Sequence, residues 1–221
     1  MRSPFADSER ERLIQAMLPD VPFDGWSQRA LRGAARRAGI SYEEATALFP
    51  RGAPDMVAAM SHWADRQMLQ RLETALLQAP GQAPGAEPLG LSRRVALAIH
   101  IRFEVVLPWR EAVRRGLSVL ALPQNAPLGL RLLYDSVDAI WEGVGDHPAD
   151  FSYYTKRASL AAILAAATLY WLEDRSPNFE DTDAFVERRL ADLYRLTGIG
   201  RRFAGASDML PNPFRLFRQP R

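Results

Sequence analysis

The chain has 221 residues, with 28 Lys and Arg against 26 Asp and Glu, and its formal net charge is +2. It contains no cysteine, which excludes disulfides, thiolate zinc sites, iron–sulfur clusters and thiol catalysis. Its pI of about 9.2 is weak evidence for a nucleic-acid partner, because a chain with one lysine and three histidines has few groups that titrate near neutral pH.

Apolar residues recur at a period near 3.6 along almost the whole chain, which predicts an all-α protein. About nine helices are expected, at residues 8–18, 27–38, 41–48, 54–78, 91–106, 109–120, 126–145, 151–174 and 181–197. Gly39 has the position of a glycine that ends a helix. Ser41 and Glu44 have the spacing of a capping box at the start of the next helix.

Three regions are expected from composition. Residues 1–52 form an N-terminal helix-turn-helix-like unit, and residues 53–198 form a larger helical bundle that binds ligand and partner. Gly and Pro dominate 79–90, APGQAPGAEPLG, which predicts a linker inside the second region. Residues 199–221 form a basic, aromatic tail interrupted by proline. That tail is either disordered or contacts a membrane surface through Phe203, Phe214, Arg215, Phe217 and Arg218.

The longest apolar run is ASLAAILAAATLYWL, residues 158–172. Its 15 residues are fewer than the roughly 20 that span a bilayer, so it predicts a central helix that is buried nearly all round. Its alanines either leave room for a lipid or only allow close helix packing. The N-terminal residues MRSPFADSERERL predict neither a secretory signal nor a transit peptide.

Few residues suggest catalysis. The histidines are His62, His100 and His147, and none follows a Glu by three positions as helical di-iron sites require. The chain has no phosphate-binding glycine loop and no G-x-S-x-G motif. We therefore expect a protein that is not an enzyme, with no catalytic residue, metal or cofactor.

Residues 29–48 have the helix-turn-helix spacing of the N-terminal domain of TetR-type regulators, and this arrangement resembles that domain. In such regulators the second helix enters the major groove. Here that helix starts with Glu43 and Glu44, which DNA phosphates repel. We expect the fold without DNA binding. The alternative is a TetR-type ligand-responsive transcriptional regulator.

The stretch from about 107 to 190 resembles the Coq-nine family of ubiquinone (coenzyme Q) biosynthesis proteins. The matching segments are LPWREAVRRGLSVLALPQNAP, LLYDSVDAIWEGVGD, DFSYYTKRASLAAI and DRSPNFEDTDAFVERRL. The first half matches more loosely, through FDGWSQRAL, and the resemblance covers about residues 12–195. It implies an all-helical, TetR-like homodimer that is a lipid-binding accessory protein. Such a protein holds an isoprenoid or quinone intermediate in an apolar pocket and presents it to a di-iron demethoxyubiquinone hydroxylase.

The resemblance also implies site residues. The family's partner-binding patch falls on Asp138, Ile140, Trp141, Asp150, Tyr153, Tyr154 and Arg157. Adjacent Tyr153 and Tyr154 cannot both point into one core, which favours an exposed aromatic there. Candidates for the lipid-binding lining are Leu133, Val137, Leu160, Ile163 and Leu164. The expected location is the cytoplasm, with peripheral association with a bacterial-type inner membrane.

Overall fold

The computed structural model describes residues 4–78, 89–145 and 152–204, and every regular element in those ranges is helical. The α-helices are α1 (Pro4–Met17), α2 (Val21–Asp24), α3 (Gln28–Ala38), α4 (Tyr42–Leu48), α5 (Ala53–Gln78), α6 (Leu91–Val106), α7 (Arg110–Leu120), α8 (Ala126–Gly143), α9 (Ser152–Glu173) and α10 (Glu180–Ala204). Short 3-10 helices occur at Leu107–Trp109, Pro123–Asn125 and Pro177–Phe179. The all-α prediction is confirmed. The four-residue α2 is an addition to the expected helices, between those at 8–18 and 27–38.

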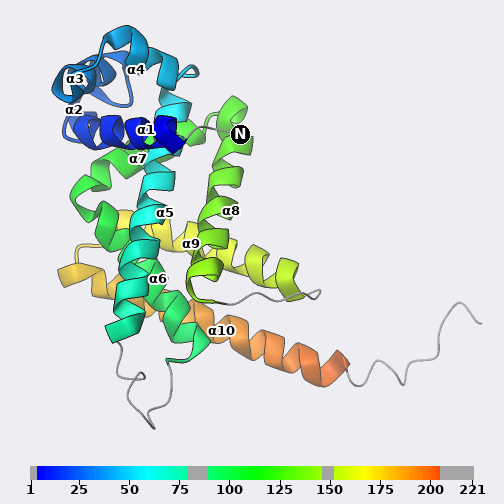
Figure 1. Cartoon of the computed structure of the whole chain (residues 1–221). Coiled ribbons are helices and arrows are strands. Elements are labelled where there is room, and N and C mark those ends of the chain that lie inside the picture. Colours follow the sequence, from blue (N-terminus) through cyan, green and yellow to red (C-terminus); the bar gives the residue numbers. More distant parts are fainter. Residues whose placement is uncertain (1–3, 79–88, 146–151, 205–221) are drawn as a thin grey trace, which may run out of the picture.

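The N-terminal unit, α1 to α4, lies at one end of the molecule (Figure 1). Helix α1 packs against α3 and α4 and buries Leu13 and Ile14 completely. The predicted helix ends are confirmed: Gly39 has φ of +70°, and Ser41 and Glu44 form both hydrogen bonds of a capping box. These local signals fix the turn between α3 and α4, as a helix-turn-helix requires.

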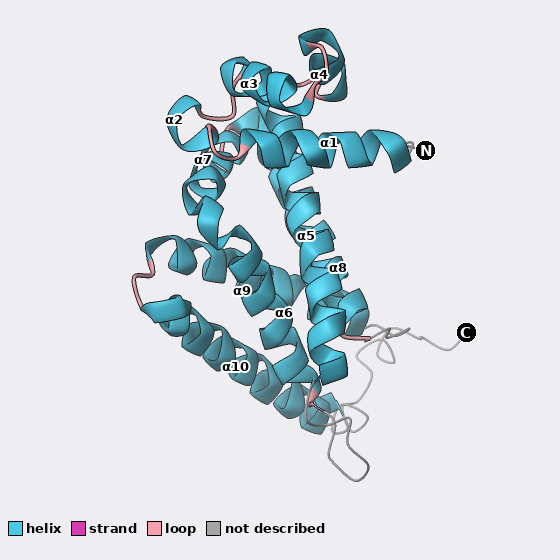
Figure 2. Cartoon of the chain, turned by 60° about the vertical axis from the view of Figure 1, so that its left-hand side comes forward, coloured by secondary structure: helices cyan, strands magenta, loops and turns pink. Residues whose placement is uncertain are grey.

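The long helix α5 connects this unit with the C-terminal bundle and packs against α1, α6, α7 and α8 (Figure 1). Helices α9 and α10 close the bundle and pack against each other, and α10 also packs on α6 (Figure 2). The contact between α6 and α9 is aromatic, since the Phe103 and Trp171 rings stack with centroids 5.2 Å apart. The cavity described below lies in this bundle.

Buried Asp174 organises the turn between α9 and α10. Its Oδ1 accepts hydrogen bonds from the backbone N–H and hydroxyl of Ser176, at 2.8 and 2.6 Å. Its Oδ2 accepts from the backbone N–H and hydroxyl of Thr182, at 2.9 and 2.5 Å. Burial alone raises the pKa of Asp174, but the hydrogen bonds from Ser176 and Thr182 outweigh it and leave the pKa below its ordinary value.

Three expectations about these helices are wrong. The run 158–172 is not buried nearly all round, because Ala158, Ala162, Ala166 and Leu169 lie on an exposed face of α9 and Leu169 is 63% exposed. On α8, Leu130 continues the apolar stripe of Leu133, Val137 and Trp141, a pattern that predicts burial, but it is 58% exposed. Helix α10 continues to Ala204, beyond the predicted end at 197. Among the described residues, no helix is long and apolar enough to cross a membrane.

Candidate functional site

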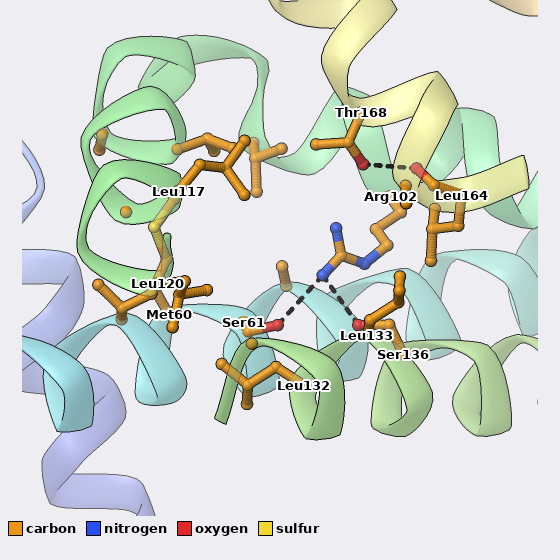
Figure 3. Close-up of a pocket in the computed structure, with 18 of the residues that line it drawn as sticks. Met60, Ser61, Arg102, Leu117, Leu120, Leu132, Leu133, Ser136, Leu164 and Thr168 are labelled. Carbon is orange, nitrogen blue, oxygen red and sulfur yellow. Dashed lines mark hydrogen bonds between the residues drawn. The ribbon is translucent and has the colours of Figure 1, made fainter. Parts of the chain in front are cut away.

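An apolar pocket of about 430 Å³ lies in the C-terminal bundle (Figure 3). Five helices contribute its lining: Val57, Met60, Ser61 and Ala64 of α5; Arg102 and Val106 of α6; Ala112, Val113, Gly116, Leu117 and Leu120 of α7, with Ala121 after it; Gly129, Leu132, Leu133 and Ser136 of α8; and Leu164, Ala165, Thr168 and Leu169 of α9. Only four of these carry a polar side chain. Pockets of this size and character hold small organic ligands.

Small residues create the space. Ala64, Ala112, Gly116, Gly129 and Ala165 lie on four different helices and all face the pocket. Protein interiors are normally close-packed, so small side chains on facing helices leave a volume that larger ones would fill. The alanines of α9 divide between the two alternatives, room for a lipid and close helix packing. Ala165 lines the pocket, whereas buried Ala161 and Ala167 allow close packing.

Arginines of α7 hold the pocket wall in place. Arg110 Nη1 donates to the backbone carbonyl of Asp174, and its guanidinium lies 4.6 Å from the Trp171 ring centroid. Arg114 donates to the carbonyl of Leu172 at 2.8 Å and pairs with Glu173 at 2.5 Å. Positive charge is favourable at the C-terminal end of a helix, where carbonyl groups lack intrahelical partners. The end of α9 is thereby tied to α7, and both helices contribute to the pocket lining.

A buried polar group forms one side of the otherwise apolar pocket. Arg102 Nε donates to Asp65 Oδ1 at 2.7 Å, and Nη2 donates to the hydroxyls of Ser61 and Ser136 at 3.3 and 3.1 Å (Figure 3). Ser136 in turn donates to Asp65 Oδ2 at 2.9 Å. The Arg102 and Asp65 side chains are only 13% and 9% exposed. The pocket lining therefore includes a nearly buried arginine whose charge Asp65 neutralises.

The sequence-based prediction did not single out Arg102 as a site residue, although its position on α6 carries a signal. Val95, Ala98, Ile99 and Val106 form the buried stripe of α6, and Arg102 falls on the same stripe. A charged residue at a core position needs a partner, because burying an unpaired charge is costly. The partner, Asp65, is 37 residues away in the sequence on a different helix, so the sequence alone does not identify the pair.

The five predicted lining residues divide into two sets. Leu133 and Leu164 line the pocket. Val137, Leu160 and Ile163 are buried in the core, outside the lining. Helical phase explains Ile163, which is adjacent to Leu164 and turns toward another side of α9. Val137 and Leu160 share a face with Leu133 and Leu164 but lie one turn away along their helices, beyond the lining.

Four residues of the predicted partner patch are described with their side chains. Arg157 Nε donates to Asp138 Oδ1 at 2.5 Å, which joins the start of α9 to α8. Ile140 is completely buried, and Trp141 is 3% exposed with Lys156 Nζ 5.7 Å from its ring centroid. The structure thus brings these positions together around the contact of α8 with α9, but it places Ile140 and Trp141 below the surface of the single chain.

The structure describes no side chain for the remaining predicted contact residues. Tyr153 and Tyr154 are in the first turn of α9, and the structure describes their backbone only; Asp150 precedes the described part of this segment. The membrane-contact residues Phe214, Arg215, Phe217 and Arg218 and the turn residue His147 also lie outside the described residues. Phe203 is in the last turn of α10, without a described side chain.

Charges on the helix-turn-helix unit are largely engaged within the chain. Arg37 donates to the carbonyl of Ala16 at 2.8 Å, and the Arg32 guanidinium lies 4.6 Å from the Tyr42 ring centroid. Glu44 keeps a pKa below its ordinary value, because the Ser41 backbone and hydroxyl bond its carboxylate. The start of α4 therefore carries negative charge, and the absence of DNA binding stays a prediction.

His100 and His62 each lie within 3.4 Å of an Asp side chain on another helix. His100 Nδ1 lies 2.8 Å from Asp183, which raises the pKa of His100 through the hydrogen bond. His62 Nε2 lies 3.4 Å from Asp135. Within residues 4–78, 89–145 and 152–204, no three His, Asp or Glu side chains gather as metal ligands would. Each histidine connects two helices.

Comparison with known proteins shows similarity to one family. The COQ9 family model matches residues 126–197. The human protein named ubiquinone biosynthesis protein COQ9, mitochondrial, is 33% identical over 85% of this chain and 58% of its own length. The protein of the same name from Drosophila melanogaster is 30% identical over 86% of this chain and 56% of its own length. The chain thus spans less than two thirds of these relatives.

A solved structure supports the fold. The crystal structure of a TetR transcriptional regulator from Nitrosomonas europaea superposes with a TM-score of 0.62 at 19% identity, over 83% of this chain and 97% of the regulator. The TetR-like fold predicted from the helix-turn-helix spacing is confirmed. The chain thus matches the COQ9 family model over α8, α9 and part of α10, and it is similar over most of its length to proteins named COQ9.

Proposed function

We propose that this chain is a non-enzymatic accessory protein of ubiquinone biosynthesis that binds an isoprenoid or quinone intermediate in the pocket between α5 and α9. It presents this lipid to a demethoxyubiquinone hydroxylase, which performs the chemistry. The observation that carries the proposal is the apolar pocket of about 430 Å³ in the bundle of a chain that matches the COQ9 family model.

The driving force is ordinary burial of hydrocarbon. An isoprenoid gains about 25 cal/mol for each Å² of apolar surface that leaves water. Most of the lining is aliphatic, and Leu169 at the rim is largely exposed, which gives a long chain a way out of the pocket. The pocket holds a ring or head with the first part of its chain, and the rest of a long isoprenoid extends past α9.

Lipid extraction with native mass spectrometry tests the binding step. We expect the purified protein to carry an isoprenoid or quinone at a stoichiometry near one. Ala165→Phe places a ring in the pocket and should remove most of the bound lipid. Ala158→Phe, on the exposed face of the same helix, should leave the lipid content unchanged. An empty wild-type protein, or equal lipid content in both variants, would contradict the proposal.

Presentation requires a partner surface and a membrane. We place the hydroxylase on the patch around the Asp138–Arg157 pair, with Tyr153 and Tyr154 as direct contacts and buried Ile140 and Trp141 as support beneath. The proposed assembly is a homodimer, peripherally bound at an inner membrane through residues 199–221. The exposed apolar face of α9 supports an interface, since Leu169 and Tyr170 are exposed there. Light scattering of Leu169→Glu should show a shift toward monomer.

A further inference from the structure

We propose that Arg102 binds an uncharged oxygen acceptor of the ligand, such as a quinone carbonyl, an ether or a phenol oxygen, and so orients the lipid with its oxygenated head at this nearly buried arginine. This inference rests on the proposed function, because it concerns the orientation and chemical class of the lipid in the same pocket.

The hydrogen bonds of Arg102 leave one of its nitrogen atoms for a ligand. A guanidinium has five N–H donors. Nε is taken by Asp65, and Nη2 bonds Ser61 and Ser136. Among the described residues, Nη1 has no hydrogen-bond partner. In Figure 3 the guanidinium extends into the pocket, with its lower nitrogen on the two serines and another nitrogen toward the open space.

The charge around Arg102 selects an uncharged group. Asp65 neutralises the guanidinium, and its two oxygens are occupied by Arg102 and Ser136. No other lining side chain is ionisable. An anion in this pocket would lose its hydration against apolar walls and face the Asp65 carboxylate, whereas a neutral acceptor costs less to desolvate. Because a guanidinium only donates, the ligand atom must accept.

The polar and apolar parts of the pocket are separated in space, which fixes the direction of the ligand. Arg102 and Ser136 belong to the lining and are nearly buried, and both are hydrogen-bonded to Asp65. Leu117 and Leu120 lie across the open space from the Arg102 guanidinium (Figure 3). An oxygenated ring bound at Arg102 therefore leaves its hydrocarbon chain against these apolar side chains. The reverse orientation buries a hydrocarbon end against an unsatisfied N–H donor.

Competition between three probes tests the assignment. The probes are ubiquinone with two isoprene units, the hydrocarbon farnesene and the anion farnesoate, offered together and detected bound by native mass spectrometry. The test variant is the double substitution Asp65→Leu with Arg102→Met, which removes the donor without leaving either charge unpaired. Arg71→Met is the control, because Arg71 is half exposed on α5 and lies outside the pocket.

We expect wild-type and Arg71→Met proteins to prefer the quinone. The double variant should lose about tenfold or more of its quinone affinity, as for one hydrogen bond to a charged donor, and should keep its farnesene affinity. Unchanged quinone preference in the double variant, or preference for farnesoate in the wild type, would overturn the assignment of Arg102 and leave lipid binding intact. If the wild type binds neither ubiquinone nor farnesene, the proposed function is overturned as well.

A second measurement uses the unmodified protein, in case the double variant does not fold. Side-chain ¹⁵N NMR of arginine should show the Arg102 signal shifting when the short-chain ubiquinone is added and staying in place with farnesene. A shift with both probes, or with neither, contradicts a specific hydrogen bond.

Discussion

Replacing Asp65 by alanine should destabilise the protein far more than removing an exposed acidic residue. Asp65 and Arg102 are 9% and 13% exposed, and Asp65 receives hydrogen bonds from Arg102 at 2.7 Å and Ser136 at 2.9 Å. The substitution leaves a buried guanidinium without its counter-charge. Breaking a buried ion pair from one side costs about 3–5 kcal/mol. The Arg102 guanidinium, left without its partner, accounts for part of that cost. Water that enters through the nearby pocket reduces the cost.

Urea unfolding followed by tryptophan fluorescence measures this change. With a slope of about 2–3 kcal/mol per M of urea, the midpoint should fall by about 1–2 M. The control is Glu104→Ala, because Glu104 is 53% exposed and lies 3.7 Å from Arg71 in a surface pair, where removal costs about 1 kcal/mol or less. The Asp65→Leu, Arg102→Met double variant should be markedly more stable than Asp65→Ala. Equal midpoints for Asp65→Ala and Glu104→Ala would refute the reasoning.

Four further outcomes are expected. Asp174→Asn should destabilise the α9–α10 turn at pH 7; because the pKa of Asp174 is lowered, this stabilisation is present above the ordinary value of 3.8 and lost as the pH falls further, so thermal unfolding of wild type and variant should converge in acid. The pKa of His100 is raised by Asp183, so its contribution is full below the ordinary value of 6.5 and is lost at higher pH; His100→Gln should lower the melting temperature at pH 6 more than at pH 9, and the opposite order would contradict this. Tyr154→Ala with Arg157→Ala should keep the circular dichroism spectrum and weaken hydroxylase pull-down, while unchanged capture would refute the patch. A salt-titrated gel shift should show no sequence-dependent DNA binding, and tight, salt-sensitive binding would favour the regulator alternative.

Local signals predicted the helices well. The capping box at Ser41 and Glu44 and the glycine at 39 are short-range features, and the structure confirms both. The end of α10 was predicted too early, since the helix contains Gly198 and Gly200 and ends only at Ala204. Glycine disfavours a helix only by about 1 kcal/mol, and the helix continues through both residues.

Long-range features were harder to predict. The pairing of Arg102 with Asp65 depends on how α5 and α6 face each other, and the pocket depends on small residues from four helices meeting at one place. The hydrophobicity of 158–172 suggested full burial, yet one stripe of α9 is exposed in the part of the chain that the structure describes. Apolar composition alone does not distinguish a core from an interface with another molecule.

Family resemblance placed the patch around Asp138 and Arg157, but it does not state which side chains reach the surface. Ile140 and Trp141 follow the core-facing phase of α8, and their burial reflects that phase. Their substitution is therefore expected to disturb the packing of α8 on α9 in addition to any effect on a partner.

Photo-crosslinking with a benzophenone-labelled isoprenoid tests the central claim most directly, since it reports where the lipid lies. After digestion, we expect labelled peptides from the lining of α5, α7, α8 and α9, and we expect Ala165→Phe to abolish the labelling while Ala158→Phe retains it. Labelling confined to the helix-turn-helix unit, or labelling that Ala165→Phe leaves unchanged, would contradict a lipid bound in this pocket.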